Sequence, residues 1–162
     1  MPRLYMKSLL DAPLEAVWAF HEDTKRGLES LSPPEAEAEV LKADKPAVGA
    51  EVIVRAKTPL GRQKVRAVYR EWEPPHGSKP HRIAYFVDEA RIWPFSQWRH
   101  THRFEETIDE GQTKVWAIDD VRYALPIWAG GVIGARFGAG PQLRKMFKYR
   151  HAKLRELLCR RS

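Results

Sequence analysis

The chain has 162 residues, which is enough for one domain and hardly two. Hydrophobic residues make up 43% of it and charged residues 30%, a balance typical of a globular protein and too apolar for a disordered chain. No run approaches the roughly 20 apolar residues of a membrane span, and the polar N-terminus does not predict a signal peptide. The single cysteine, Cys159, excludes an intramolecular disulfide and a cysteine-cluster zinc site. We therefore expect a cytoplasmic protein of one domain, residues 1–162, that needs no cofactor.

The first elements in the chain are predicted to be a strand and two short helices. The strand covers residues 3–10 and ends at Asp11-Ala12-Pro13, where the aspartate can cap a helix over 14–21. A second helix is expected at about 25–31, because Ser32-Pro33-Pro34 stops it. Beyond these prolines the hydrophobic period changes from that of a helix to that of a strand.

A series of six strands follows the two helices. Alternation of apolar and polar residues predicts strands at about 36–42, 51–57, 64–70, 81–90, 97–108 and 112–124. The segment Asp109-Glu110-Gly111 is a hairpin signal between the last two. Strands in series form an antiparallel meander, so we expect a curved sheet of about seven strands whose apolar face needs a cover.

The last part of the chain is predicted to supply that cover. A helix is expected from Pro141 to about Cys159, because Gly140-Pro141 suits a helix start. Its apolar stripe consists of Leu143, Met146, Phe147, Leu154, Leu157 and Leu158. A curved sheet around one helix leaves a concave, mostly apolar space, as small-molecule sites require. The glycine-rich segment 127–140 would then be a mobile apolar lid or, equally, a packed loop.

Three sequence motifs accompany this order of elements. They are Trp93-Pro94-Phe95-Ser96-Gln97-Trp98-Arg99-His100-Thr101-His102-Arg103-Phe104, Asp119-Asp120-Val121-Arg122-Tyr123-Ala124-Leu125-Pro126 and Phe147-Lys148-Tyr149-Arg150. Over nearly the whole chain, the motifs and the element order resemble the START-like (helix-grip, SRPBCC) superfamily, and in it the bacterial polyketide cyclase/dehydrase-like members. The resemblance implies an α+β helix-grip fold with a hydrophobic internal cavity. It does not identify the ligand, because the superfamily includes lipid carriers, other hydrophobic-ligand binders and polyketide aromatases.

Strand alternation places several candidate ligand-binding residues on the concave face of two neighbouring strands. They are Trp98, His100, His102 and Phe104 on the first strand and Asp119 and Tyr123 on the second. A buried aspartate costs several kcal/mol unless it is paired, so a histidine or an arginine is the expected partner. Tyr69 and Tyr85 are further candidates for the cavity wall, although aromatic residues at this spacing also suit a simple core.

Arg150 lies within the apolar stripe of the last helix rather than on its basic side. An arginine in that position must reach the rim or find an anion, which Asp119 or a ligand carboxylate would provide. We hypothesise that Arg150, Asp119 and the two histidines form the polar end of an apolar pocket. The same residues also suit a polar network that fixes strand register and binds nothing. Zinc would need Asp119 beside the His-x-His pair, and we predict no metal.

The positive charge gathers at the C-terminal end of the chain. Of the net charge of +7, residues 136–162 carry +8, with nine Lys and Arg side chains against Glu156. Such a segment can contact phosphates or anionic lipids, or can be a solvated helix face. Nucleic acid is disfavoured, because the basic side of the helix lacks the exposed aromatic residues that stack on bases.

Three functions therefore remain open. The favoured one is binding or carriage of a small hydrophobic ligand, lipid-like or polyketide-like, with an acidic group as an option. The second is a cyclase or dehydratase in which His100, His102 and Asp119 supply acid–base catalysis; we assign no catalytic residue beyond that condition. The third is an interaction module that touches an anionic membrane or, less favourably, nucleic acid through its basic helix. The chain is expected to be a monomer or a homodimer, with Trp116 and Ile118 on the outer face as a dimer patch.

Overall fold

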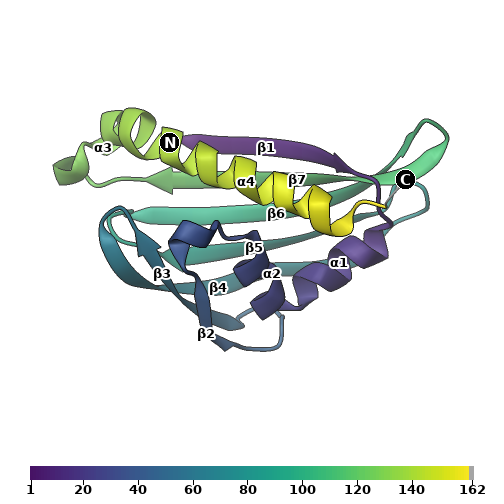
Figure 1. The fold of residues 1–162 in the computed structure, drawn as a ribbon, viewed down its shortest axis with the longest axis horizontal. Helices are drawn as coiled ribbons and strands as arrows, with labels where there is room; N and C mark the ends of the chain where they lie inside the picture. Colours follow the sequence, from purple (N-terminus) through teal and green to yellow (C-terminus); the bar gives the residue numbers. More distant parts are fainter. Residues whose placement is uncertain (161–162) are drawn as a thin grey trace.

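The computed structural model describes residues 1–160; Arg161, counted above in the basic segment, lies outside the described residues. Seven antiparallel strands form one sheet in the order β1-β7-β6-β5-β4-β3-β2. The strands are β1 (Arg3–Leu10), β2 (Glu39–Ala43), β3 (Glu51–Thr58), β4 (Gly61–His76), β5 (Ile83–Arg91), β6 (Gln97–Asp109) and β7 (Gln112–Ala124). The long C-terminal helix α4 (Gly140–Leu158) lies across one face of this sheet (Figure 1). The expected α+β helix-grip fold is confirmed.

Two short helices, α1 (Leu14–Glu22) and α2 (Thr24–Leu31), follow β1 and cover the part of the sheet that α4 does not reach (Figure 1). The side chain of Asp23 caps α2 by accepting a hydrogen bond from the backbone N–H of Arg26 at 3.2 Å. Helix α1 buries Trp18 against the aromatic rings of Phe86 and Phe104 from the sheet. This aromatic cluster closes one end of the interior.

A second apolar cluster lies under the start of α4. It contains Trp98, Val121, Tyr123 and Phe147, all less than a tenth exposed. The inward set on β6 and β7 is the one that alternation predicts, since a strand sends every second side chain to the same face. On the outer face Trp116 is half-buried, and Lys7 lies over its ring at 4.3 Å. The two apolar clusters leave the middle of the interior to polar side chains.

The expected helix start at Pro141 is wrong. Helical structure begins at α3 (Gly131–Ile133) and continues through a π-helical turn, Gly134–Ala139, directly into α4. Pro141 cannot donate the usual i to i−4 hydrogen bond, and the wide π-helical turn before it absorbs this defect without ending the helix. Within segment 127–140, Ile127–Ala129 forms a 3₁₀ turn, and residues 131–139 extend the last helix. Among the described residues, no helix is long and apolar enough to cross a membrane.

Candidate functional site

A cavity of about 210 Å³ lies between the sheet, α2 and α4. Its walls are mainly apolar, with Leu28 and Leu31 from α2, Val52 and Val54 from β3, Val65 and Ala67 from β4, Phe86 and Ala90 from β5, and Met146 and Phe147 from α4. Polar side chains from three elements share one wall: Asp88 from β5, His100 and His102 from β6, and Arg150 from α4. The cavity thus has an apolar body and a polar end.

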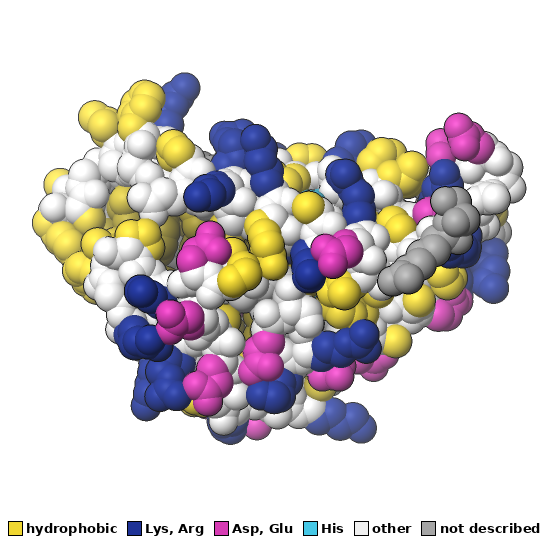
Figure 2. All heavy atoms as spheres, in the orientation of Figure 1, with side chains coloured by type: hydrophobic (Ala, Val, Ile, Leu, Met, Phe, Trp, Pro, Cys, Tyr) yellow, Lys and Arg dark blue, Asp and Glu magenta, His cyan; other side chains and the backbone are white. Residues whose placement is uncertain are grey.

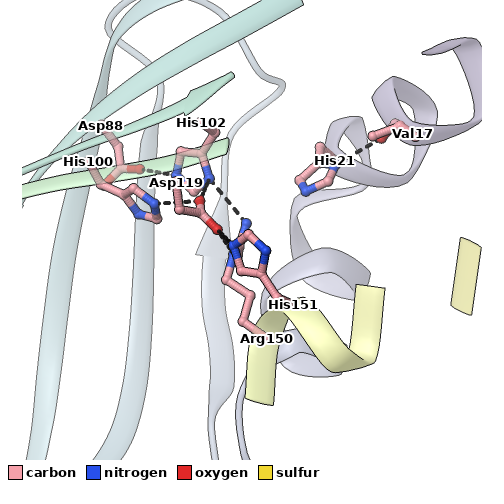
Figure 3. Close-up of polar contacts among 8 residues, drawn as sticks. All are labelled: Val17, His21, Asp88, His100, His102, Asp119, Arg150 and His151. Carbon is pink, nitrogen blue, oxygen red and sulfur yellow. Dashed lines mark hydrogen bonds and ion pairs between the residues drawn. The ribbon is translucent and has the colours of Figure 1, made fainter. Parts of the chain in front are cut away.

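Asp119 on β7 is the centre of the polar network behind that wall (Figure 3). Its carboxylate accepts hydrogen bonds from Nε2 of His100 at 2.7 Å, Nε2 of His151 at 2.8 Å and Nε of Arg150 at 3.0 Å. Only 3% of the residue is exposed, so these partners replace the water that a free carboxylate would hold. The ion pair between Arg150 and Asp119 that the helical wheel suggested is present.

Strand register and helix position bring these groups together. In the β6–β7 hairpin His102 lies opposite Asp119, and His100 lies two residues further along β6 on the same face. Arg150 and His151 descend from α4 on the other side of the carboxylate (Figure 3). The site therefore exists only when the hairpin and the last helix are both folded.

Hydrogen-bond geometry assigns the protons of the three histidines. Each Nε2 lies against a carboxylate and must donate: His100 and His151 to Asp119, and His102 to Asp88 at 2.8 Å. The Nδ1 of His102 accepts from Nη2 of Arg150 at 3.1 Å. The Nδ1 of His100 makes no hydrogen bond within the described part of the chain. His100 therefore keeps an unshared nitrogen lone pair on a residue that lines the cavity.

On the side away from the cavity, His151 connects the network to the first strand. Its Nδ1 lies 2.6 Å from the hydroxyl of Ser8 on β1, and Nη2 of Arg155 donates to the same hydroxyl at 3.0 Å. Since Ser8 accepts from the arginine, its own O–H is free to donate to His151. Arg155, Ser8, His151 and Asp119 thus form a continuous chain of hydrogen bonds from α4 to the buried carboxylate.

Charge is distributed unevenly in this interior. Burial opposes ionisation of Asp119, but Arg150 and the hydrogen bonds from histidines hold the pKa of that carboxyl well below its ordinary value. Burial likewise raises the pKa of Asp88, yet the hydrogen bond from His102 and the nearby His102, His100 and Arg150 side chains together outweigh it and leave the pKa lowered. Burial, with His100 and Arg150 nearby, lowers the pKa of His102 to about 4, so this imidazole is neutral at pH 7. Two ionised carboxylates, of Asp88 and Asp119, therefore lie near one guanidinium, that of Arg150.

His21 on α1 is a further buried histidine beside the cavity. Its Nδ1 donates to the backbone carbonyl of Val17 at 2.8 Å, whereas its Nε2 is buried without a hydrogen-bond partner among the described residues. Burial lowers the pKa of His21 to about 3, and the side chain is neutral at pH 7. Figure 3 shows its ring on the α1 side, across from the Asp119 network.

The predicted site residues divide into two groups. Those that line the cavity are Tyr69, Trp98, His100, His102 and Arg150. Four others do not. Asp119 lies behind the histidines, Phe104 packs against Trp18, and Tyr123 belongs to the second apolar cluster, where its hydroxyl donates to the carbonyl of Ala135 at 3.3 Å.

Tyr85 was placed on the wrong face of its strand. On β5 the side chains of Ala84, Phe86 and Asp88 point inward, so the intervening tyrosine must point outward. Tyr85 pairs with Arg103 on the outer face of the sheet and cannot line the cavity. Period-two alternation alone gives this result. If Ala84, Phe86 and Asp88 lie on the inner face, Tyr85 and Val87 must lie on the outer face.

Sequence reasoning missed Asp88, His151, Ser8 and His21. The signal for Asp88 was weak but present, since it shares a strand face with Phe86 and Ala90 and a carboxylate on an apolar face needs a partner. His151 lies four residues after Phe147 in the same helix and so on the same face, which could have identified it. His21 likewise lies four residues after the buried Val17, and Ser8 shares a strand face with Leu4 and Leu10.

Three of these polar residues are of the types that bind metal ions. One ligand atom each of Asp88, His100 and His102 lies within 4.8 Å of the others. Both ring nitrogens of His102 are already engaged, by Asp88 and by the guanidinium of Arg150. A second cation would face the fixed positive charge of Arg150 at the same imidazole. The arrangement therefore fits an ion-pair network better than a metal centre.

Comparison with known proteins identifies the fold. No family model and no curated protein sequence matches the chain. Among solved structures, protein Ms6760 from Mycobacterium smegmatis is 17% identical, with a TM-score of 0.61 over 96% of this chain and 89% of that one. The di-domain ARO/CYC StfQ of the steffimycin biosynthetic pathway is 11% identical, with a TM-score of 0.65 over 96% of this chain and 50% of StfQ.

A third similar structure is a point mutant of norcoclaurine synthase from Thalictrum flavum, in complex with a transition state analogue. It is 12% identical, with a TM-score of 0.56 over 96% of both chains. Identities this low support the architecture and not a shared activity. What these similarities show is the fold: the chain has the helix-grip architecture of these structures.

Proposed function

We propose that the protein binds a compact, mostly apolar molecule in the cavity, with a neutral hydrogen-bonding group of that molecule at the polar end. The observation that carries the proposal is the apolar cavity of about 210 Å³ with Arg150 and His100 on one wall. Apolar walls contribute affinity by removing ligand surface from water, and a few polar groups set its orientation. This is also the general role of the fold in its hydrophobic-ligand binders.

The size of the cavity restricts the ligand. A dry apolar cavity of about 150 Å³ holds benzene, and drug-sized ligands occupy roughly 300–1,000 Å³. A volume of about 210 Å³ therefore suits one substituted ring or two fused rings. A long acyl chain or a four-ring polyketide would need a larger space than these walls enclose.

The charges favour a neutral head group over the acidic one considered at first. Asp88 and Asp119 together outnumber the single guanidinium of Arg150, and the neutral His102 adds no positive charge. A ligand carboxylate would add a third buried anion, which is costly without a further cation. A hydroxyl or carbonyl group, in contrast, can accept from the Nη1 of Arg150 at no such cost, and a hydroxyl can also donate to the Nδ1 of His100.

A matched set of three two-ring probes tests this proposal. Calorimetric titration at pH 7 would compare naphthalene, 2-naphthol and 2-naphthoate, which share a ring system and differ in head group. We expect 2-naphthol to bind at least about tenfold more tightly than either of the others, equivalent to about 1.4 kcal/mol. Tighter binding of 2-naphthoate would overturn the neutral head group.

A pair of variants on one strand tests the place of binding. Ala67 lines the cavity, and its neighbour Val68 lies on the opposite face of β4. Ala67→Phe fills the cavity and should abolish 2-naphthol binding, whereas Val68→Phe should leave it within about threefold. Equal loss in both variants, or no loss in Ala67→Phe, would overturn the cavity as the binding site.

Acid–base catalysis is a second candidate function, and one observation favours it. The Nδ1 of His100 is unpaired beside the cavity, while Asp119 holds the proton on its Nε2. A carboxylate behind an imidazole fixes the tautomer and stabilises the imidazolium after proton transfer. His102 is a poorer base, because its pKa of about 4 and its contact with Arg150 oppose protonation.

The probe 5-nitrobenzisoxazole tests for such a base. A base removes its C3 proton, the ring N–O bond breaks, and the coloured 2-cyano-4-nitrophenolate forms without a co-reactant. We expect a rate at pH 7 above that of buffer, lost in His100→Gln and kept in His76→Gln, which changes an exposed histidine at the end of β4. A rate equal to that of buffer, or equal loss in the two variants, would remove catalysis by His100 as a candidate.

A further inference from the structure

Apolar side chains stand exposed at the end of the molecule where the C-terminal helix begins. Ile127 is 94% exposed, Trp128 70%, Val132 68%, Ile133 73% and Phe137 72%. Trp93, 55% exposed, stacks on Trp128 with ring centroids 6.1 Å apart. These six residues are called the apolar tip. Figure 2 shows apolar side chains gathered at this end, where Figure 1 labels α3.

Tight backbone packing holds the apolar tip in place. A Cβ on Gly134 would lie only 2.5 Å from the carbonyl oxygen of Ala129, so the chain passes over itself there without room for a side chain. Ala135 is the residue that this turn buries, at 0% exposed. Because these small residues face inward, the large apolar residues face outward. Their exposure therefore follows from the backbone geometry of the turn and not from poor packing.

The stretch of chain that carries most of the apolar tip has only positive charge. From Val121 to Arg155 it contains no aspartate or glutamate. Four of its exposed basic side chains, Arg136, Arg144, Lys145 and Lys148, follow the apolar tip on the helical run, and none of these four takes part in an ion pair within residues 1–160. The guanidinium of Arg136 lies 5.6 Å from the ring centre of Phe137, so charge and apolar surface meet directly.

We propose that the apolar tip docks into the interface of an anionic lipid bilayer, with the four basic side chains on the lipid headgroups. Tryptophan and other large apolar side chains enter the headgroup–acyl boundary, and Lys and Arg beside them are attracted by anionic lipid. A second copy of the chain is a poorer partner, because pairing two tips would bring like charges together. The inference does not depend on which ligand the cavity holds.

Docking in this way would also orient the cavity. Ile92 lines the cavity and the next residue, Trp93, belongs to the apolar tip. Phe147 lines the cavity from the same helical run, ten residues after Phe137. An apolar molecule dissolved in the bilayer would therefore meet the protein at the end where sheet and helix both lead to the cavity.

Vesicle sedimentation tests the proposal with the full-length protein. One set of vesicles contains phosphatidylcholine alone, and the other contains equal parts of phosphatidylcholine and phosphatidylglycerol. We expect partitioning at least about tenfold stronger onto the anionic vesicles at low salt, reduced at high salt. Equal binding to both vesicles, or binding to neither, would overturn the anionic bilayer as the partner.

Two matched pairs of variants locate the contact. Trp128→Ser with Phe137→Ser should lower partitioning at least about tenfold, whereas Ile108→Ser with Leu157→Ser, also exposed but on the β6–β7 hairpin and at the far end of α4, should leave it unchanged. Arg136→Gln with Lys145→Gln should weaken binding to anionic vesicles, and Lys45→Gln with Lys64→Gln should do so much less. Circular dichroism checks that each variant is folded.

The competing partner has its own readout. Light scattering after gel filtration measures the oligomeric state at the concentrations used for sedimentation. A dimer that the serine variants of the apolar tip convert to a monomer would overturn the proposal in favour of self-association. Equal loss of vesicle binding in the control pairs would overturn it as well.

Discussion

The helical run from Gly131 to Leu158 exposes apolar side chains in its first half and buries polar side chains in its second half. In its second half, Arg150 and His151 are held among buried residues by hydrogen bonds to Asp119. In its first half, Val132, Ile133 and Phe137 point into water. The buried polar side chains hydrogen-bond to one another, whereas the exposed apolar ones lie largely in water. The buried polar half of the run stabilises the fold, and the exposed apolar half offers a contact surface to a partner.

The largest expected loss of stability comes from removing the buried negative charge of Asp119, which tests whether the buried half of the run stabilises the fold. Asp119→Asn keeps the shape of the side chain but leaves the Arg150 guanidinium without its carboxylate, and we expect unfolding in urea to lose about 3–5 kcal/mol. The matched change Asp120→Asn affects a partly exposed pair with Arg3 on the outer face and should cost at most about 1 kcal/mol. Similar losses at both positions would mean that the buried network does not stabilise the fold.

A change of pH probes the neutral buried histidine. The pKa of His21 is about 3 in the folded protein and roughly 6.5 in the unfolded chain, so the unfolded chain takes up a proton first as pH falls. Stability should therefore drop by about 3 kcal/mol between pH 6.5 and pH 4 on account of this residue. His21→Leu should remove that part of the acid loss.

The control for this prediction is His81→Leu, which changes an exposed histidine before β5 and should leave the pH profile as it is. The free energy of unfolding, measured in urea at several pH values, gives both results. An unchanged slope in His21→Leu would show that this histidine is protonated in the folded state.

The smallest expected effects on stability concern the exposed half of the run, at the turn beneath the apolar tip. Gly134→Ala places a Cβ 2.5 Å from a backbone oxygen and should cost about 1–3 kcal/mol, because the turn beneath the apolar tip must shift. Gly138→Ala meets nothing within 4 Å and should be neutral or stabilise by up to about 1 kcal/mol. Thermal unfolding compares the two variants, and equal melting temperatures would show that the turn is not closely packed.

Much of the interior could be predicted because it depends on short-range periodicity. Alternation alone placed His100, His102 and Asp119 on one face, and the helical wheel placed Arg150 opposite them. Most strand bounds agree for the same reason, with two exceptions: β2 begins at Glu39 after a short 3₁₀ turn, Pro34–Ala36, and β4 spans Gly61–His76 instead of about 64–70. Local pattern is informative wherever one face of an element is buried.

What could not be predicted depends on contacts distant in the sequence. Asp88 pairs with His102 only because β5 and β6 pair in one particular register, which no local pattern specifies. The Pro141 prediction failed because a wide turn upstream compensated for the missing N–H, and periodicity carries no sign of such a turn. Whether the cavity walls meet or leave a space is decided by side-chain packing across four elements.

Ser8 and His151 come from the first and last elements of the chain, and their hydrogen bond joins the two ends. Until the ribosome has released Arg150 and His151, Asp119 has no guanidinium and the β6–β7 hairpin carries an unpaired carboxylate on its inner face. The domain is therefore expected to complete its folding only after α4 has emerged from the ribosome. A chain cut before residue 150 would keep the sheet-forming sequence and still lack the means to bury it.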